Sequence, residues 1–239
     1  SSITVIGGSF TGNAAQNNGG AIYVNNYSYK ENDTDEEYIV VNASVNIDGA
    51  IFRNNRGDRG GALYVGKNSY TLSNVQFLNN SAASDTYGGG AIYSTEAAGK
   101  LTNITMTGNR SVKGGAVAMH SGSSMTVSGL TASDNSATVN SEGKIGTGGV
   151  FYMNKSDLTL DGANSTIRFS GNSAVNGGVI YAEPNGGVNP VITITGAEFM
   201  DNTASGHGGA LYLSTAELTL NGVKMKGNTA AKNGGAAYL

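Results

Sequence analysis

The hexapeptide GGAIYV, residues 19–24, returns seven more times in this chain of 239 residues as two glycines followed by small and apolar residues. The later copies begin at Gly60, Gly89, Gly114, Gly148, Gly177, Gly208 and Gly234. Tyr occupies the fifth position in every copy except one, where Ala118 replaces it. Such recurrence indicates a repeat architecture, in which each copy has the same structural role.

A second motif, Phe-x-x-Asn, precedes each glycine pair, although Met106, Ala132 and Met225 replace the Phe in three copies. The residue before the final Asn is always Gly, Asn or Asp. These residue types tolerate left-handed backbone, so we predict a sharp turn there. We also predict that the Asn side chains bond to one another along the repeat axis. They are Asn13, Asn55, Asn80, Asn109, Asn135, Asn172, Asn202 and Asn228.

Segments of alternating polar and apolar residues, such as ITITGAEF from Ile192, lie before the Phe-x-x-Asn motif and predict strands. The glycine pairs recur 25 to 41 residues apart. A unit of about 25 residues with three short strands is typical of a parallel β-helix. Leucine-rich repeats and propellers fit the spacing and pattern less well. We therefore predict an all-β fold, a single-stranded right-handed parallel β-helix (solenoid) of about eight to nine rungs.

The same alternation assigns the two faces of the strand after each glycine pair. The apolar residues on either side of the Tyr are expected to point into the core, so the Tyr points outward. Such rings would form an exposed stack at about 4.8 Å spacing, which either stabilises neighbouring rungs or contacts a sugar or peptide. The stack comprises Tyr23, Tyr64, Tyr93, Tyr152, Tyr181, Tyr212 and Tyr238.

Composition excludes several classes of function. There is no Cys, which removes disulfides and thiolate metal sites, and the net charge is −3 without a basic cluster, which disfavours nucleic acid. The acidic insertion from Lys30 to Tyr38 could offer Ca²⁺ the carboxylates of Asp33, Asp35, Glu36 and Glu37. It lacks the ligand order of a dedicated calcium loop, so a solvated insertion is favoured, and no metal or cofactor is expected.

Two further patterns suggest specific activities. Arg56, Gly57 and Asp58 lie between Asn55 and Gly60, where an exposed turn could present them to an integrin, or where they merely connect two strands. A glycoside hydrolase needs two carboxylates about 5 to 10 Å apart.

Asp48 and Asp161 are the aspartates of equivalent turns, but they would lie four rungs apart. His120 and His207, the two imidazoles, fall in different parts of their rungs. We expect no enzyme and no catalytic residues, with a polysaccharide-binding or polysaccharide-cleaving β-helix as the alternative.

The alternation of GGA[ILV] with Phe-x-x-Asn over the whole chain resembles the passenger region of chlamydial polymorphic membrane proteins and related adhesin-like bacterial surface proteins. The resemblance implies an outer-membrane-anchored or wall-linked, extracellular scaffold without catalysis. Its loops would bind proteins or glycans of host or neighbouring cells, and self-association is a further expectation. We expect residues 1–239 to be one β-helix domain from a longer surface protein, with insertions near residues 27–38 and 136–147.

Overall fold

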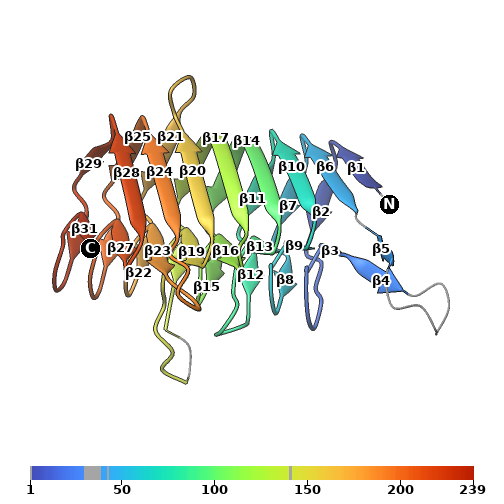
Figure 1. Cartoon of the computed structure of the whole chain (residues 1–239), viewed down its shortest axis with the longest axis horizontal. Helices are drawn as coiled ribbons and strands as arrows, with labels where there is room; N and C mark the ends of the chain where they lie inside the picture. The colour runs from blue at the N-terminus through green and yellow to red at the C-terminus, as the bar shows by residue number, and fades with distance from the viewer. Residues whose placement is uncertain (1, 30–38, 42, 140–141) are drawn as a thin grey trace.

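The computed structural model describes residues 2–29, 39–41, 43–139 and 142–239, and these residues form a coil of short strands without a helix (Figure 1). The two termini lie at opposite ends of the coil. No stretch within the described ranges is a helix of the length and apolarity needed to cross a bilayer. The predicted calcium ligands Asp33, Asp35, Glu36 and Glu37 lie outside the described residues.

Three parallel sheets run along the coil, and a separate antiparallel hairpin joins β4 (Tyr27–Tyr29) to β5 (Ile39–Val41). One row of hydrogen-bonded strands runs through the large sheet. It contains β1 (Ser2–Ile6), β6 (Ser44–Asp48), β10 (Ser69–Ser73), β14 (Ala98–Thr107), β17 (Ser124–Ser133), β20 (Asp157–Asp161), β24 (Val191–Thr195) and β28 (Glu217–Asn221). A second row of the same sheet carries six of the Phe or Met positions, and it contains β2 (Ser9–Thr11), β7 (Ile51–Arg53), β11 (Gln76–Leu78), β21 (Ile167–Ser170), β25 (Ala197–Met200) and β29 (Lys224–Lys226). Met106 and Ala132 lie in the long strands β14 and β17, which continue into this row.

The strands after the glycine pairs form the second sheet, called here the glycine-pair sheet. They are β3 (Ile22–Asn25), β9 (Leu63–Gly66), β13 (Ile92–Thr95), β16 (Val117–His120), β19 (Phe151–Asn154), β23 (Ile180–Glu183), β27 (Leu211–Leu213) and β31 (Ala237–Tyr238). Equivalent positions of neighbouring rungs pair with each other, and Tyr64 lies opposite Tyr23 on one side and Tyr93 on the other. This register confirms the parallel solenoid. The eight strands enclose seven turns, and the right-handed sense stays a prediction.

The third sheet consists of two-residue strands that the sequence pattern did not predict. They are β8 (Arg56–Gly57), β12 (Ser81–Ala82), β15 (Arg110–Ser111), β18 (Ser136–Ala137), β22 (Ser173–Ala174), β26 (Thr203–Ala204) and β30 (Thr229–Ala230). Each follows directly after a motif Asn, and its second residue turns toward the interior, as Ala82 and Ala137 do. Two residues are too few to show a period, so each rung has a further strand that alternation could not reveal.

The first seven glycine pairs each meet two different steric demands. Gly60 has a φ of +65°, a left-handed conformation that side chains other than glycine disfavour. A Cβ on Gly61 would lie 2.1 Å from the carbonyl oxygen of Gly90 in the next rung. The first glycine therefore makes the turn and the second allows the rungs to approach.

The motif asparagines form a continuous series, called here the asparagine ladder, which is buried from Asn55 to Asn202. In Asn80, the backbone N–H and the side-chain Nδ2 both donate to Oδ1 of Asn109, each at 3.0 Å. The second Nδ2 hydrogen bonds to the Phe52 carbonyl at 3.0 Å, and Oδ1 of Asn80 accepts two bonds from Asn55. Every polar atom of the buried amide thus has a partner, which confirms the predicted bonding along the axis.

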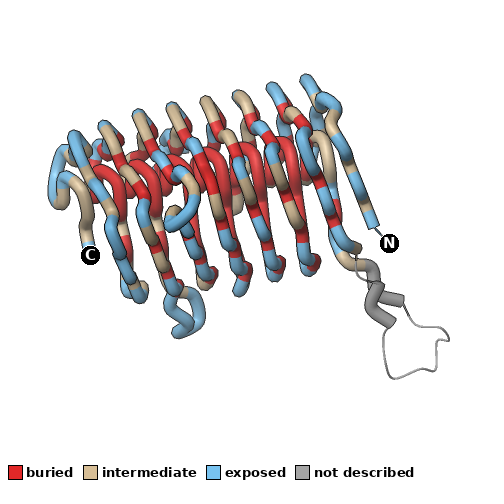
Figure 2. The backbone as a smooth tube through the Cα atoms, turned by 90° about the horizontal axis from the view of Figure 1, so that it is seen from above, coloured by how far each residue is buried: buried red, intermediate tan, exposed pale blue. Residues whose placement is uncertain are grey.

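The apolar core runs through the interior of the coil, and most side chains that line it in the first and last rungs are only partly buried (Figure 2). Phe rings stack within it, with centroids 4.7 Å apart for Phe10 and Phe52 and 5.1 Å apart for Phe52 and Phe77. Where Ala132 replaces the Phe, the glycine-pair strand of the same rung supplies Phe151, which is fully buried. A large residue from one sheet therefore offsets a small one from another, which keeps the core densely packed.

Replacing Asn109 with Ala should destabilise the fold by about 3 kcal/mol or more, because it leaves the N–H of Asn80, one Nδ2 hydrogen of Asn80 and the Phe77 carbonyl without partners in a buried site. Urea unfolding followed by circular dichroism measures the change. Asn46→Ala, on an exposed position of β6, is the matched control and should stay within about 0.5 kcal/mol of the parent. Equal stability of the two variants would contradict the role given to the ladder.

Candidate functional site

The outer face of the glycine-pair sheet carries a column of stacked tyrosine rings, called here the tyrosine ladder. Ring centroids lie 4.8 Å apart between Tyr23 and Tyr64 and 5.1 Å apart between Tyr64 and Tyr93. Further along the axis the separations are 5.9, 4.8 and 4.9 Å. That half comprises Tyr152, Tyr181, Tyr212 and Tyr238. The predicted stack is present on the predicted face of the strands.

His120 closes the gap that Ala118 would leave in this column. Both residues belong to β16 and, two positions apart, share the outer face of the sheet. The imidazole centroid lies 5.2 Å from Tyr93 and 5.2 Å from Tyr152, the ladder rings on either side. The sequence analysis considered His120 only as one of two imidazoles in different parts of their rungs, whereas the structure makes it the eighth ring of the ladder.

The predicted exposure of the ladder is wrong for its middle part. Tyr64, Tyr93 and Tyr152 are 7%, 2% and 1% exposed, whereas Tyr23 is 51% exposed and Tyr181 and Tyr212 are half-buried. The segment before the third glycine pair covers the middle rings, because Tyr87 packs edge-on against Tyr93 at 6.1 Å.

Cations strengthen this cover. The Arg59 guanidinium lies 3.7 Å from the ring centroid of Tyr87, and Lys113 Nζ lies 4.4 Å from that of Tyr152. These covering residues come from loops whose path the strand periodicity does not determine.

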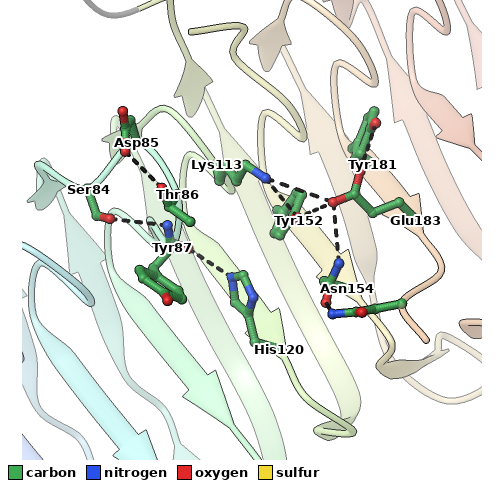
Figure 3. A network of polar contacts seen from close by, with 11 residues as sticks. Ser84, Asp85, Thr86, Tyr87, Lys113, His120, Tyr152, Asn154, Tyr181 and Glu183 are labelled. Carbon is green, nitrogen blue, oxygen red and sulfur yellow. Dashed lines mark hydrogen bonds and ion pairs between the residues drawn. The ribbon is translucent and has the colours of Figure 1, made fainter. Parts of the chain in front are cut away.

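A polar network surrounds Glu183 at the point where the ladder becomes more exposed (Figure 3). The hydroxyl of Tyr152 donates to Glu183 Oε1, and that of Tyr181 donates to Oε2 at 3.1 Å. Lys113 Nζ donates to the Tyr152 oxygen at 2.9 Å and lies 3.8 Å from Glu183 Oε1. Asn154 Nδ2 donates to the same carboxylate oxygen at 3.3 Å. The network ties three rungs together through one carboxylate.

The charges and the burial in this network keep its phenols from acting as acids or bases near pH 7. Burial, and then the Glu183 carboxylate, raise the pKa values of Tyr152 and Tyr181. Burial also lowers the pKa of His120 to about 4, and its Nε2 lies 3.1 Å from the Tyr87 carbonyl oxygen. Since a carbonyl can only accept, this Nε2 carries the proton of the neutral imidazole. The arrangement stabilises protonated phenols and a neutral histidine near pH 7.

Stacking also limits what the ladder could bind. Tyr181 lies at 10° to Tyr152 and at 10° to Tyr212, so both of its ring faces are occupied by neighbouring rings. A sugar that stacks on an aromatic face needs one of those faces free. The inner rings therefore present edges and hydroxyls, and the observed packing favours the stabilising role of the stack over sugar stacking.

The tripeptide Arg56, Gly57 and Asp58 does not form the exposed turn predicted for it. Arg56 and Gly57 are strand β8 and pair with Ser81 and Ala82 of the next rung. Gly57 is buried, Asp58 is half-buried, and the Arg59 Nε lies 3.8 Å from Asp58 Oδ2. The backbone is extended and hydrogen-bonded here because the residues after each motif Asn join the third sheet.

The remaining candidate residues do not come together. Asp48 and Asp161 stand on β6 and β20, four strands apart in the large sheet, as predicted. His207 lies at the far end of the glycine-pair sheet, 4.9 Å from the ring of Tyr238. Within the described residues, no group of three or more His, Cys, Asp or Glu side chains is placed to hold a metal ion.

Comparisons with known proteins bear out the resemblance. The Chlamydia polymorphic membrane protein repeat matches residues 7–25, 74–95, 166–183 and 196–214. The chain is also 31% identical over 218 residues to a probable autotransporter, YfaL, of Escherichia coli strain K12. That match covers 88% of this chain and 14% of the relative, so the chain spans about a seventh of that protein. No solved structure matches the chain.

The buried imidazole predicts a pH-dependent stability. Its folded pKa of about 4 lies below the unfolded value of 6.5, so the unfolded chain binds the proton first as pH falls. The contribution of His120 is fully present above pH 6.5 and is lost toward pH 4, by about 3 kcal/mol.

In urea titrations at a series of pH values, His120→Phe should show a shallower decline over this window than the parent chain. Tyr93→Phe, which keeps the imidazole, should keep the parent slope. A His120→Phe variant with the parent pH dependence would contradict the assignment.

The shared slot of Ala118 and His120 predicts a compensating pair of substitutions. Ala118→Tyr should cost about 2 kcal/mol, because the new ring competes with the imidazole for the same space. His120→Ser should also destabilise, since it empties the slot.

The double variant should be more stable than the sum of the single effects by more than about 1 kcal/mol, as a double-mutant cycle would measure. Additive effects would show that the two side chains do not share a site.

Proposed function

We propose that this chain, which carries polymorphic membrane protein repeats and is related to a probable autotransporter, is part of a surface-displayed adhesin in which the β-helix is the scaffold and the loops bind. The family relationship supports a surface passenger. Binding to proteins or glycans of host or neighbouring cells is our inference from the organisation of the coil.

Exposed apolar side chains lie on a loop that projects from the coil, and their location is the main support for this proposal. After β18 the chain leaves the body of the coil, in yellow-green in Figure 1, before it returns at β19. Val139 and Ile145 in this segment are 51% and 54% exposed. Large apolar side chains that project from a rigid scaffold are typical of sites that contact a partner.

Two observations favour binding over catalysis. The Glu183 network holds its phenols protonated, and the aspartates of equivalent turns, Asp48 and Asp161, are four strands apart. A glycosidase would need two carboxylates across one bond. We therefore propose a non-catalytic protein, and incubation with pectin-like polymers should yield no new reducing or unsaturated ends.

The adhesion test compares beads coated with the parent chain and with Val139→Ser/Ile145→Ser on cultured epithelial cells and on a glycan array. Loss of the two apolar side chains should weaken binding about tenfold. Val191→Ser/Leu220→Ser is the matched control, because these exposed residues lie on β24 and β28 of the coil rather than on a loop.

Parent-like binding by the loop variant, or an equal loss in the control, would contradict the proposal. Asp58→Glu should leave adhesion unchanged, because Asp58 is held beside the strand β8 and is half-buried. Loss of adhesion in that variant would instead favour recognition of the Arg-Gly-Asp tripeptide.

A further inference from the structure

We propose that Tyr181 and Tyr212 form an oxidative modification site, at which a peroxide-derived one-electron oxidant joins the two rings into a dityrosine. The two residues pair directly in β23 and β27, and their ring centroids lie 4.8 Å apart at an interplanar angle of 10°. Both side chains are half-buried, so they are accessible to a small oxidant. This chemistry goes beyond the binding role proposed above and does not depend on it.

Glu183 gives Tyr181 the acceptor that such an oxidation requires. A phenol that loses an electron also loses its proton, and the Tyr181 hydroxyl already donates to Glu183 Oε2 at 3.1 Å. Lys113 Nζ lies 3.8 Å from the other carboxylate oxygen and balances its charge. The proton can therefore pass to a base in contact with the phenol while the ring stays in its stack.

The coupling removes two electrons and two protons from the pair of phenols. Tyr181 and Tyr212 each give up one electron and one proton, and a carbon–carbon bond forms between ring carbons ortho to the two oxygens. Each displaced ortho hydrogen then moves to the oxygen of its own ring, which restores both phenols. The two electrons and two protons that have left reduce one hydrogen peroxide to two waters, so the product is lighter by two hydrogen atoms.

Other neighbours in the tyrosine ladder fit this reaction less well. Tyr212 and Tyr238 stack at 4.9 Å and 18°, but neither of their hydroxyls donates to a carboxylate of the described residues, as that of Tyr181 does. Tyr64 is buried, and its ring lies at 32° to that of Tyr23. Tyr152 is also buried, and its centroid is 5.9 Å from that of Tyr181. Because the chain has no Cys, the new bond would supply the covalent tie between rungs that a disulfide cannot supply here.

The test treats dilute purified chain with hydrogen peroxide and a haem peroxidase, and then digests it with trypsin and a glutamate-specific protease. Tyr181 falls in residues 169–198 and Tyr212 in residues 199–217, so cleavage after Glu198 separates them unless they are joined. We expect these two peptides linked, with a mass two hydrogens below their sum, and dityrosine fluorescence in the monomer fraction.

Tyr212→Phe keeps the stacked ring but lacks the phenol, and it should lose the linked peptide. Tyr23→Phe is the matched control and should retain the parent yield. Glu183→Gln should slow the reaction without changing its position.

The proposal is overturned if Tyr212→Phe forms as much monomeric dityrosine as the parent, if the link maps to another pair, or if the folded monomer forms none. Treatment in denaturing urea should abolish the preference for this pair, and an unchanged preference there would also count against a site made by the fold.

Discussion

The constraint on which the structure depends is that a buried amide must find all its hydrogen-bond partners in the rungs above and below. From Asn55 to Asn202, each motif Asn accepts from the preceding rung through Oδ1, and its Nδ2 donates both to the next motif Asn and to a backbone carbonyl of the preceding rung. An amide shifted out of register would leave several buried polar groups unpaired, at a cost of about 1–3 kcal/mol for each. The ladder therefore fixes the registration of rungs that differ greatly in length.

Loop length is free because registration is set at two fixed points, the motif Asn and the glycine pair. The insertions lie between these points, and both the large sheet and the glycine-pair sheet keep their pairing across them. The tyrosine ladder depends on the same registration, since rings one rung apart can stack only where their strands pair residue to residue. The core, the tyrosine ladder and the Glu183 network all depend on the same registration of the rungs.

The features that repeat could be predicted from the sequence because the same short motif imposes the same local conformation in all eight copies. The left-handed residue before every motif Asn was expected from residue type, and all eight have positive φ. They are Gly12, Asn54, Asn79, Gly108, Asp134, Gly171, Asp201 and Gly227. What could not be predicted occurs once. His120 entering the slot of Ala118, and Tyr87 covering Tyr93, depend on the path of one loop or rotamer and have no period. The two-residue strands were missed for another reason, since they repeat but are too short to alternate.

The asparagine ladder also gives the coil an electrical direction. From Asn55 to Asn202, each side-chain amide points its oxygen toward the N-terminal rung and one of its two N–H groups toward the C-terminal rung, while the other N–H donates to a backbone carbonyl of the N-terminal rung. Peptide dipoles in a sheet largely cancel, whereas side-chain dipoles aligned head to tail add together. The row of amides thus behaves as an axial dipole whose negative pole faces the N-terminal rung, opposite in sense to that of an α-helix.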